Sequence, residues 1–357
     1  MQSCGTYAPT TRALVSLLRS FARSFFAFLL LLVIVFHSSV AANMKSDLVG
    51  ELMLAFVEQG DTLSDIARSY NQGYTEMRLA NPAIDPWLPQ AGTDVIIPSL
   101  YILPSAKTAG IVINIPEMRM YVFGTSTREN SFEMSTYPVS VGRQKWGTPH
   151  GAMTVTMKLE DPAWYPPDSI LAEHAANGDP LPKVVVAGPK NPLGKFAMLL
   201  SEKGYLIHGT NKPYGIGMRV THGCIRMYPK HIKKLFANTK SGTKVLIVNQ
   251  PIKVGVDAGI IYLEAHPSLK ENPGDLASRY AETMRLLDLQ FGSDEFKLRY
   301  LAVQKALRLE NGIPTSIGVI GDNVIRKRSL FLHSLFEHAL DTGSVCFSSC
   351  LCFLSCS

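Results

Sequence analysis

The sequence predicts a mainly β protein, in which a β-sandwich or barrel lies between a small α/β module and a helical extension. Three observations support this prediction. Short apolar segments with a period of two recur between residues 110 and 250, and Gly and Pro residues separate them. Strand-like and helix-like patterns alternate over residues 52–99, and apolar residues at helical spacing follow within residues 255–320. A chain of 357 residues is long enough for more than one domain.

Residues 1–42 have the pattern of a secretory signal peptide. Three arginines, Arg12, Arg19 and Arg23, precede an apolar run at 25–36, and small residues suited to cleavage follow it. The run is shorter than the roughly 20 apolar residues that span a bilayer. We therefore expect export with cleavage, and an uncleaved inner-membrane anchor is the alternative.

Charge and cysteine placement narrow the class of protein further. Three of the six net positive charges belong to the signal arginines, and so small a remainder excludes a nucleic-acid-binding surface. Four of the six cysteines lie within 346–356, in a tail (321–357) of unknown structure, and Cys4 lies in the signal segment. Cys224 is thus an unpaired thiol in the fold of an exported protein, where cysteines normally pair. Chemistry explains it better than packing, although a small buried apolar residue is the alternative.

The module at 52–99 reads as a domain of its own. Its predicted elements are a strand at 52–57, a helix from Asp61 or Thr62 to Tyr70, a helix at 77–81 and a strand at 94–98. The second helix ends at Asn81 because the residue before a proline leaves the helical region.

This order of elements, together with Gly60-Asp61-Thr62-Leu63 and Asn81-Pro82, resembles the LysM module. The resemblance implies binding to the N-acetylglucosamine backbone of peptidoglycan, and a small module without sugar affinity is the alternative. We expect a hinge at 103–108 between this module and the next domain. Deletion of the module at 52–98 should lower retention on the cell wall and leave turnover of soluble substrate nearly unchanged.

The catalytic region is predicted at 109–250. The segments with strand character lie at 111–115, 118–122, 154–157, 184–187, 197–200, 205–208 and 244–248. One helix is expected at 228–236, and the extension at 255–320 is expected to be helical, chiefly over 272–309.

Candidate site residues gather around Thr221-His222-Gly223-Cys224-Ile225-Arg226, with His208 upstream. A nucleophilic cysteine needs a base to take its proton, and His208 and His222 are both candidates. Gly223 lets the backbone approach a substrate carbonyl, so the N–H groups of Gly223 and Cys224 are candidates for an oxyanion hole. Arg226 lies on the same side as Cys224 in an extended strand, where it can bind a carboxylate.

The spacing of these residues closely resembles the L,D-transpeptidase family with its YkuD-type β-sandwich domain. The resemblance implies that Cys224 is the nucleophile, that His208 is the proton donor and acceptor, and that the Gly209 carbonyl orients the His208 ring. It further implies backbone N–H donors at His222, Gly223 and Cys224, and acylation by carbapenems. Its implied substrate-binding residues are Arg226, Thr221, Asn211 and Tyr205. Thr221 stands where many members have Ser.

The resemblance implies an enzyme without cofactor or metal that acts on peptidoglycan tetrapeptide stems. The overall layout is similar to Gram-negative periplasmic members that join an outer-membrane lipoprotein to peptidoglycan, which favours a lipoprotein lysine as acceptor and a periplasmic location. Cross-linking of two stems (3→3) is the alternative reaction. Two other classes remain open: a zinc enzyme that uses His208, His222 and Cys224, and a non-catalytic protein that binds the cell wall.

Overall fold

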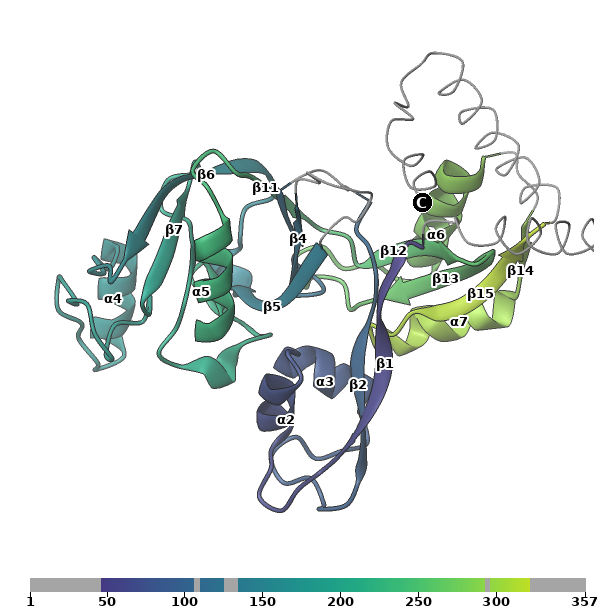
Figure 1. The fold of residues 1–357 in the computed structure, drawn as a ribbon, viewed down its shortest axis with the longest axis horizontal. Helices are drawn as coiled ribbons and strands as arrows, with labels where there is room; N and C mark the ends of the chain where they lie inside the picture. The colour runs from purple at the N-terminus through teal and green to yellow at the C-terminus, as the bar shows by residue number, and fades with distance from the viewer. Residues whose placement is uncertain (1–45, 106–109, 125–133, 293–295, 322–357) are drawn as a thin grey trace, which may run out of the picture. The chain divides into compact units, whose positions relative to one another are not determined.

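A computed structural model describes residues 46–105, 110–124, 134–292 and 296–321 (Figure 1). The signal segment at 1–42, residues 106–108 of the expected hinge and residues 322–357 of the tail lie outside these residues. Within the described ranges, no helix has both the length and the apolar character needed to cross a membrane.

The N-terminal module has the predicted order of elements. Strand β1 (Leu48–Phe56) pairs antiparallel with β2 (Asp94–Ile102), and helices α2 (Leu63–Ser69) and α3 (Tyr74–Ala80) lie between them in sequence. The Thr62 side chain caps α2 by accepting a hydrogen bond from the Asp65 N–H. Leu63, Met77 and Ile97 are fully buried between the two helices and the β1–β2 sheet.

The central region forms one nine-stranded sheet in the order β10-β8-β7-β6-β11-β3-β4-β5-β9. Its strands are β3 (Gly110–Asn114), β4 (Arg119–Phe123), β5 (Met134–Gly142), β6 (Gly151–Glu160), β7 (Phe196–Leu200), β8 (Leu206–His208), β9 (Arg219–Thr221), β10 (Ile225–Met227) and β11 (Lys244–Val248). Strand β10 also pairs with β5, so the sheet closes on itself. Its main core includes Met198, Ile207 and Ile225, and a second cluster with Val112 and Tyr121 lies on β3 and β4. The mainly β class is therefore confirmed.

Two helices accompany this sheet. Helix α5 (Pro229–Asn238) agrees with the prediction and contributes Ile232 and Leu235 to the core. Helix α4 (Asp168–Ala176) was not expected, and Ile170 is the residue that it buries. The strand expected at 184–187 is wrong: Val185 forms an isolated bridge with Trp164, and the neighbouring Val184 and Val186 are exposed. Apolar composition alone suggested that strand, but no neighbouring surface covers it.

The C-terminal extension is more than helical. Helices α6 (Leu276–Phe291) and α7 (Tyr300–Leu309) lie in the predicted helical region, but they pack with a four-stranded sheet in the order β12-β13-β15-β14. The strands are β12 (Ile252–Asp257), β13 (Ile260–Ala265), β14 (Phe296–Leu298) and β15 (Thr315–Ile320). Ala258 and Gly259 join β12 to β13, and both have positive φ angles (46° and 81°), as a two-residue type I′ turn requires. Ala-Gly is a weak turn signal, which explains why this hairpin escaped the sequence prediction.

A buried ionic cluster joins this sheet to the rest of the protein. The Lys253 Nζ lies 3.0 Å from a Glu117 oxygen and 2.7 Å from a Glu264 oxygen, and it donates to the Ile102 carbonyl at 2.7 Å. Both carboxylates and the ammonium are buried, so each charge needs the others to offset its lost hydration. The cluster therefore fixes the end of β2, the turn after β3 and the C-terminal sheet to one another.

Candidate active site

Two neighbouring strands bring the predicted site residues together. Strands β8 and β10 pair in parallel, with Ile207 opposite Ile225 and His208 opposite Arg226. Cys224 comes directly before β10, and its sulfur lies within hydrogen-bonding reach of the Leu206 backbone at the start of β8. The parallel register thus places the thiol beside the strand that carries His208.

The Cys224 thiol is neutral at rest. Cys224 is partly accessible to solvent, and its thiol donates a hydrogen bond to the Gly204 carbonyl at 3.6 Å. Burial raises the pKa of the thiol, while the Leu206 backbone and the positive Arg226 act in the opposite direction. The nucleophile must therefore lose its proton as it attacks.

His208 is suited to take that proton. Burial and the nearby Arg226 charge lower the pKa of the imidazole to about 3, against the opposing effect of the Gly209 and Leu193 backbone, so the ring is neutral at pH 7. The His208 Nδ1–H donates to the Gly209 carbonyl at 2.7 Å. This contact fixes the ring and the tautomer and leaves Nε2 as the basic nitrogen.

The loop before Cys224 requires glycine at position 223. Gly223 has a φ of +105°, and a Cβ atom there would lie 2.6 Å from the Tyr205 ring. The Thr148 hydroxyl donates to the Gly223 carbonyl at 2.8 Å. Tyr205 therefore packs against the loop that carries the nucleophile.

Thr221 shapes the same loop. Its hydroxyl donates to the Cys224 carbonyl at 2.6 Å and accepts from the Gly223 N–H at 3.2 Å. The side chain is buried, at 3 % exposure, so it faces the loop and not the solvent. A substrate oxyanion that used the Gly223 N–H would have to compete with this hydroxyl.

The side chain of His222 binds residues that the sequence did not indicate. Its Nε2 lies 3.0 Å from a Glu173 oxygen and 2.7 Å from the Arg143 Nη2, and its ring meets the Trp146 ring edge-on at 5.2 Å. Arg143 also pairs with Glu173, and its hydrogen bond is the main reason that the Glu173 pKa is lowered. Arg143 follows β5 and Glu173 belongs to α4, so neither carried a local motif that could have revealed it.

A zinc site that uses His208, His222 and Cys224 was the alternative interpretation of these residues. Among the described residues, the acidic and imidazole groups that do converge are Glu117, Glu264 and His266, far in sequence from Cys224. The Lys253 Nζ already lies against both carboxylates there, so an ammonium occupies the place where a cation would bind. Neither observation gives support to a metal centre.

Arg226 brings a positive charge to the site. Its Nε is buried without a hydrogen-bond partner in the described part of the chain, and its Nη1 lies near Gly215. An orphaned guanidinium N–H next to a nucleophile is suited to bind a carboxylate. Asn211, in contrast, is exposed, and its amide donates to the Pro189 carbonyl at 3.4 Å.

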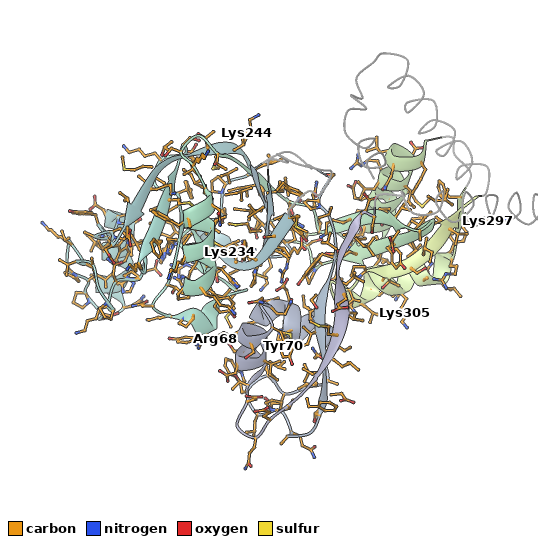
Figure 2. All side chains as sticks on the ribbon, in the orientation of Figure 1. Arg68, Tyr70, Lys234, Lys244, Lys297 and Lys305 are labelled. Atoms are coloured by element: carbon orange, nitrogen blue, oxygen red, sulfur yellow. The ribbon has the colours of Figure 1, made fainter. Side chains whose placement is uncertain are left out.

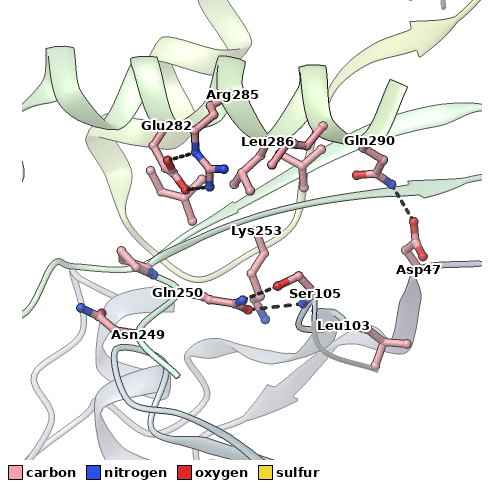
Figure 3. Close-up of a pocket in the computed structure, with 14 residues that line it drawn as sticks. Asp47, Leu103, Ser105, Asn249, Gln250, Lys253, Glu282, Arg285, Leu286 and Gln290 are labelled. Carbon is pink, nitrogen blue, oxygen red and sulfur yellow. Dashed lines mark hydrogen bonds and ion pairs between the residues drawn. The ribbon is translucent and has the colours of Figure 1, made fainter. Parts of the chain in front are cut away.

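A separate cavity of about 740 Å³ lies between the start of β12 and helix α6 (Figure 3). Gln250, Lys253 and Gln290 are among the side chains on its walls, and an Arg285–Glu282 ion pair lies along α6. None of the lining residues belongs to the cysteine site, so this cavity is not the candidate active site.

The raised thiol pKa predicts how Cys224 reacts with pH. The alkylation rate by iodoacetamide should keep rising beyond pH 8.5, because a thiol with a raised pKa is still mostly protonated at the ordinary cysteine value of about 8.5. His208 stays neutral above about pH 5, since its pKa is about 3, and adds no step between pH 5 and 8. Mass spectrometry of the Cys224 peptide follows the reaction, with the denatured chain as the control of ordinary pKa. A plateau reached below pH 7 would show a thiolate–imidazolium pair and contradict this account.

Comparisons with known proteins place this geometry in a family. Residues 108–247 match the L,D-transpeptidase catalytic domain (YkuD), and residues 57–98 match the LysM domain. The chain is 38% identical over 278 residues to the probable L,D-transpeptidase YcfS of Escherichia coli K12, a match that covers 76% of this chain and 85% of that protein. It is 38% identical over 261 residues to the probable L,D-transpeptidase ErfK/SrfK of Salmonella typhimurium, covering 71% and 83%.

A third relative extends the match. The probable L,D-transpeptidase YbiS of Escherichia coli K12 is 36% identical over 290 residues, which covers 80% of this chain and 87% of that protein. Identity at this level over most of both chains, together with the cysteine site described above, shows that this protein is an enzyme of the L,D-transpeptidase family.

Proposed function

We propose that Cys224 attacks the bond between diaminopimelate and D-alanine in the tetrapeptide stem of peptidoglycan and transfers the acyl group to an amine. The observation that carries the proposal is the parallel pairing of β8 and β10, which brings the neutral thiol of Cys224 and the neutral, oriented imidazole of His208 onto neighbouring strands. Thiol attack assisted by a positioned base is the chemistry that this arrangement supports best.

The reaction has two halves that use the same groups. In the first, the Cys224 proton moves to Nε2 of His208, the sulfur–carbon bond forms, and the carbon–nitrogen bond breaks as His208 protonates the leaving amine of D-alanine. In the second, an acceptor amine attacks the thioester, gives its proton to His208, and the sulfur leaves and regains a proton. Each half begins and ends with a neutral site.

Other residues of the site have supporting roles in this proposal. The backbone N–H groups of His222 and Cys224 are the candidate donors to the oxyanion, and that of Gly223 could join them only by leaving the Thr221 hydroxyl. Arg226 binds a carboxylate of the donor stem through its unpartnered Nε–H. Tyr205 and Thr221 contact the loop that carries the thiol, and the exposed Asn211 stays a proposed substrate contact.

The two histidines should differ in their effect on rate. His208→Ala should lower kcat by roughly two to four orders of magnitude, the usual contribution of a positioned general base. His222→Ala should lower it by about tenfold or less, because the His222 ring binds Glu173 and Arg143. Release of D-alanine from soluble disaccharide-tetrapeptide measures both variants. The reverse order of effects would assign the base to His222.

The proposal also names the amine that accepts the acyl group from Cys224. We favour the lysine amine of an outer-membrane lipoprotein over a second stem, and we place the reaction in the periplasm. The layout of a LysM module, a YkuD-type domain and a C-terminal extension supports this choice. The LysM module would hold the enzyme on the glycan strands.

Analysis of cell walls separates the two acceptors. In cells that lack the protein, stems bearing lysine-containing remnants of the lipoprotein should disappear from trypsin-digested sacculi, while 3→3 dimers remain. Complementation with the wild-type gene should restore the remnants and the Cys224→Ala gene should not. Persistence of the remnants with loss of 3→3 dimers would identify a second stem as the acceptor.

A further inference from the structure

The LysM module contacts the chain segment that leads to the catalytic motif. This approach segment, residues 213–218, lies between His208 and Cys224 in sequence. The N–H groups of Tyr74 and Thr75, in the first turn of α3, donate to the carbonyls of Ile216 (3.0 Å) and Gly217 (3.2 Å). The Ser64 hydroxyl of α2 donates to the Tyr214 carbonyl at 3.1 Å.

Every carbonyl from Tyr214 to Gly217 is therefore held. The remaining one, of Gly215, accepts from the Ser140 hydroxyl of β5 at 2.7 Å. Three of these four donors come from the LysM module. A segment whose successive carbonyls are all bound has little freedom to shift without breaking several hydrogen bonds.

The contact is too close for any side chain. A Cβ atom on Gly73 would lie 2.8 Å from the Gly217 Cα, and a Cβ atom on Gly217 would lie 2.3 Å from the Gly73 Cα. Gly217 also has a φ of +82°, which favours glycine, whereas the φ of −90° at Gly73 is open to any residue. Alanine at Gly73 would thus act chiefly by pushing on the approach segment, and its Cβ would also lie 3.0 Å from an oxygen of Glu76.

A buried ion pair fixes the module at this point. The Glu76 carboxylate accepts from Nε of Arg119 on β4 at 2.6 Å and from its Nη2 at 2.9 Å, and both side chains are buried. The same carboxylate accepts from the Gly73 N–H at 2.5 Å. Removing either partner would leave a buried charge uncompensated, so the pair makes separation of the module from the sheet costly.

Further contacts hold the module against helix α5. Tyr228 donates to the Gln72 carbonyl at 3.2 Å, and the His231 Nε2 lies 3.0 Å from the Asn71 side chain. Lys230 donates to the Arg68 carbonyl at 3.4 Å, and Figure 2 shows Arg68 beside the end of this helix. The module is thus packed on the catalytic domain through these contacts, and the hinge expected at 103–108 stays a prediction.

The approach segment in turn meets the reactive groups. It continues into β9, which ends at Thr221, the residue that shapes the loop of Cys224. Nη1 of Arg226 lies 4.0 Å from the position of a Cβ on Gly215, and Tyr214 is close enough to affect the Arg226 charge. A displacement of the segment would therefore reach both the nucleophile loop and the guanidinium.

We propose that the LysM module is a positioning element of the active site. By holding residues 214–217, it sets the surroundings of Arg226 and the loop of Cys224, and it contributes to turnover itself as well as to retention on the glycan. Gly73 and Ser64 are positioning residues in this scheme, since they act through the approach segment. The inference rests on the proposed role of Cys224 as the nucleophile.

Gly73→Ala tests the proposal, and the folded fraction is measured because the added Cβ also lies close to the Glu76 carboxylate. The added Cβ must displace Gly217 by about half an ångström, because contacts below 3.4 Å are rare, and small misplacements of reacting groups are costly in rate. We expect kcat/KM for release of D-alanine from soluble disaccharide-tetrapeptide to fall about tenfold or more per mole of folded enzyme, chiefly through kcat. Ser64→Ala, which removes one hydrogen bond, should give a smaller fall in the same direction.

Gly274→Ala is the matched control, because its Cβ would meet no atom closer than 3.4 Å. It should keep the wild-type rate, and retention of Gly73→Ala on sacculi should equal that of the wild type. A wild-type kcat/KM in folded Gly73→Ala would overturn the proposal. If Gly73→Ala does not fold, a wild-type kcat/KM in Ser64→Ala would overturn it instead. Cys224→Ala in the same assay tests the proposed function separately from the positioning role of the module. Turnover by that variant would contradict the role of Cys224 itself.

Discussion

The site depends on one short strand that has two partners. Strand β10 pairs in parallel with β8 and antiparallel with β5, and it closes the nine-stranded sheet. Arg226 is thereby fixed opposite both His208 and Ser140. Since a slip of one residue would turn every side chain of β10 to the other face, the register that builds the core also sets the site. Ile225 and Met227, buried on the core side, hold that register.

Burial of this junction then determines its electrostatics. Removal from water raises the pKa of Cys224 and lowers that of His208, so both groups rest in their neutral forms. The positive charge of Arg226 favours the thiolate of Cys224 and disfavours the imidazolium of His208. It therefore assists loss of the thiol proton but opposes a lasting protonation of His208. A neutral resting pair keeps the nucleophile unreactive until a substrate brings groups that stabilise the developing charge.

The sequence was most informative where the chemistry is local. The motif from Thr221 to Arg226, with His208 upstream, identified the family and residues that the structure brings together. Glycine at 223 was expected for close backbone approach, and the positive φ angle there shows a further reason for it.

Contacts between distant segments could not be predicted in this way. Glu173 reaches His222 from a helix with a weak apolar pattern, and neither residue reveals the other in the sequence. The β12–β13 hairpin has no strong turn signal, and Lys253 within β12 reads as an exposed residue although it is buried between two carboxylates. The contact of Gly73 with Gly217 joins positions 144 residues apart, and glycines carry no pattern by which such a partner could be found.

The LysM module and the catalytic sheet of this enzyme share contacts along the segment that leads to Cys224. The central claim is that this thiol, of Cys224, carries the acyl group during transfer. Intact-protein mass spectrometry after incubation with a carbapenem tests it most directly. The wild type should gain the mass of one carbapenem, located by peptide mapping to Cys224, and a folded Cys224→Ala variant should gain none. An adduct of equal stoichiometry on Cys224→Ala would contradict the account.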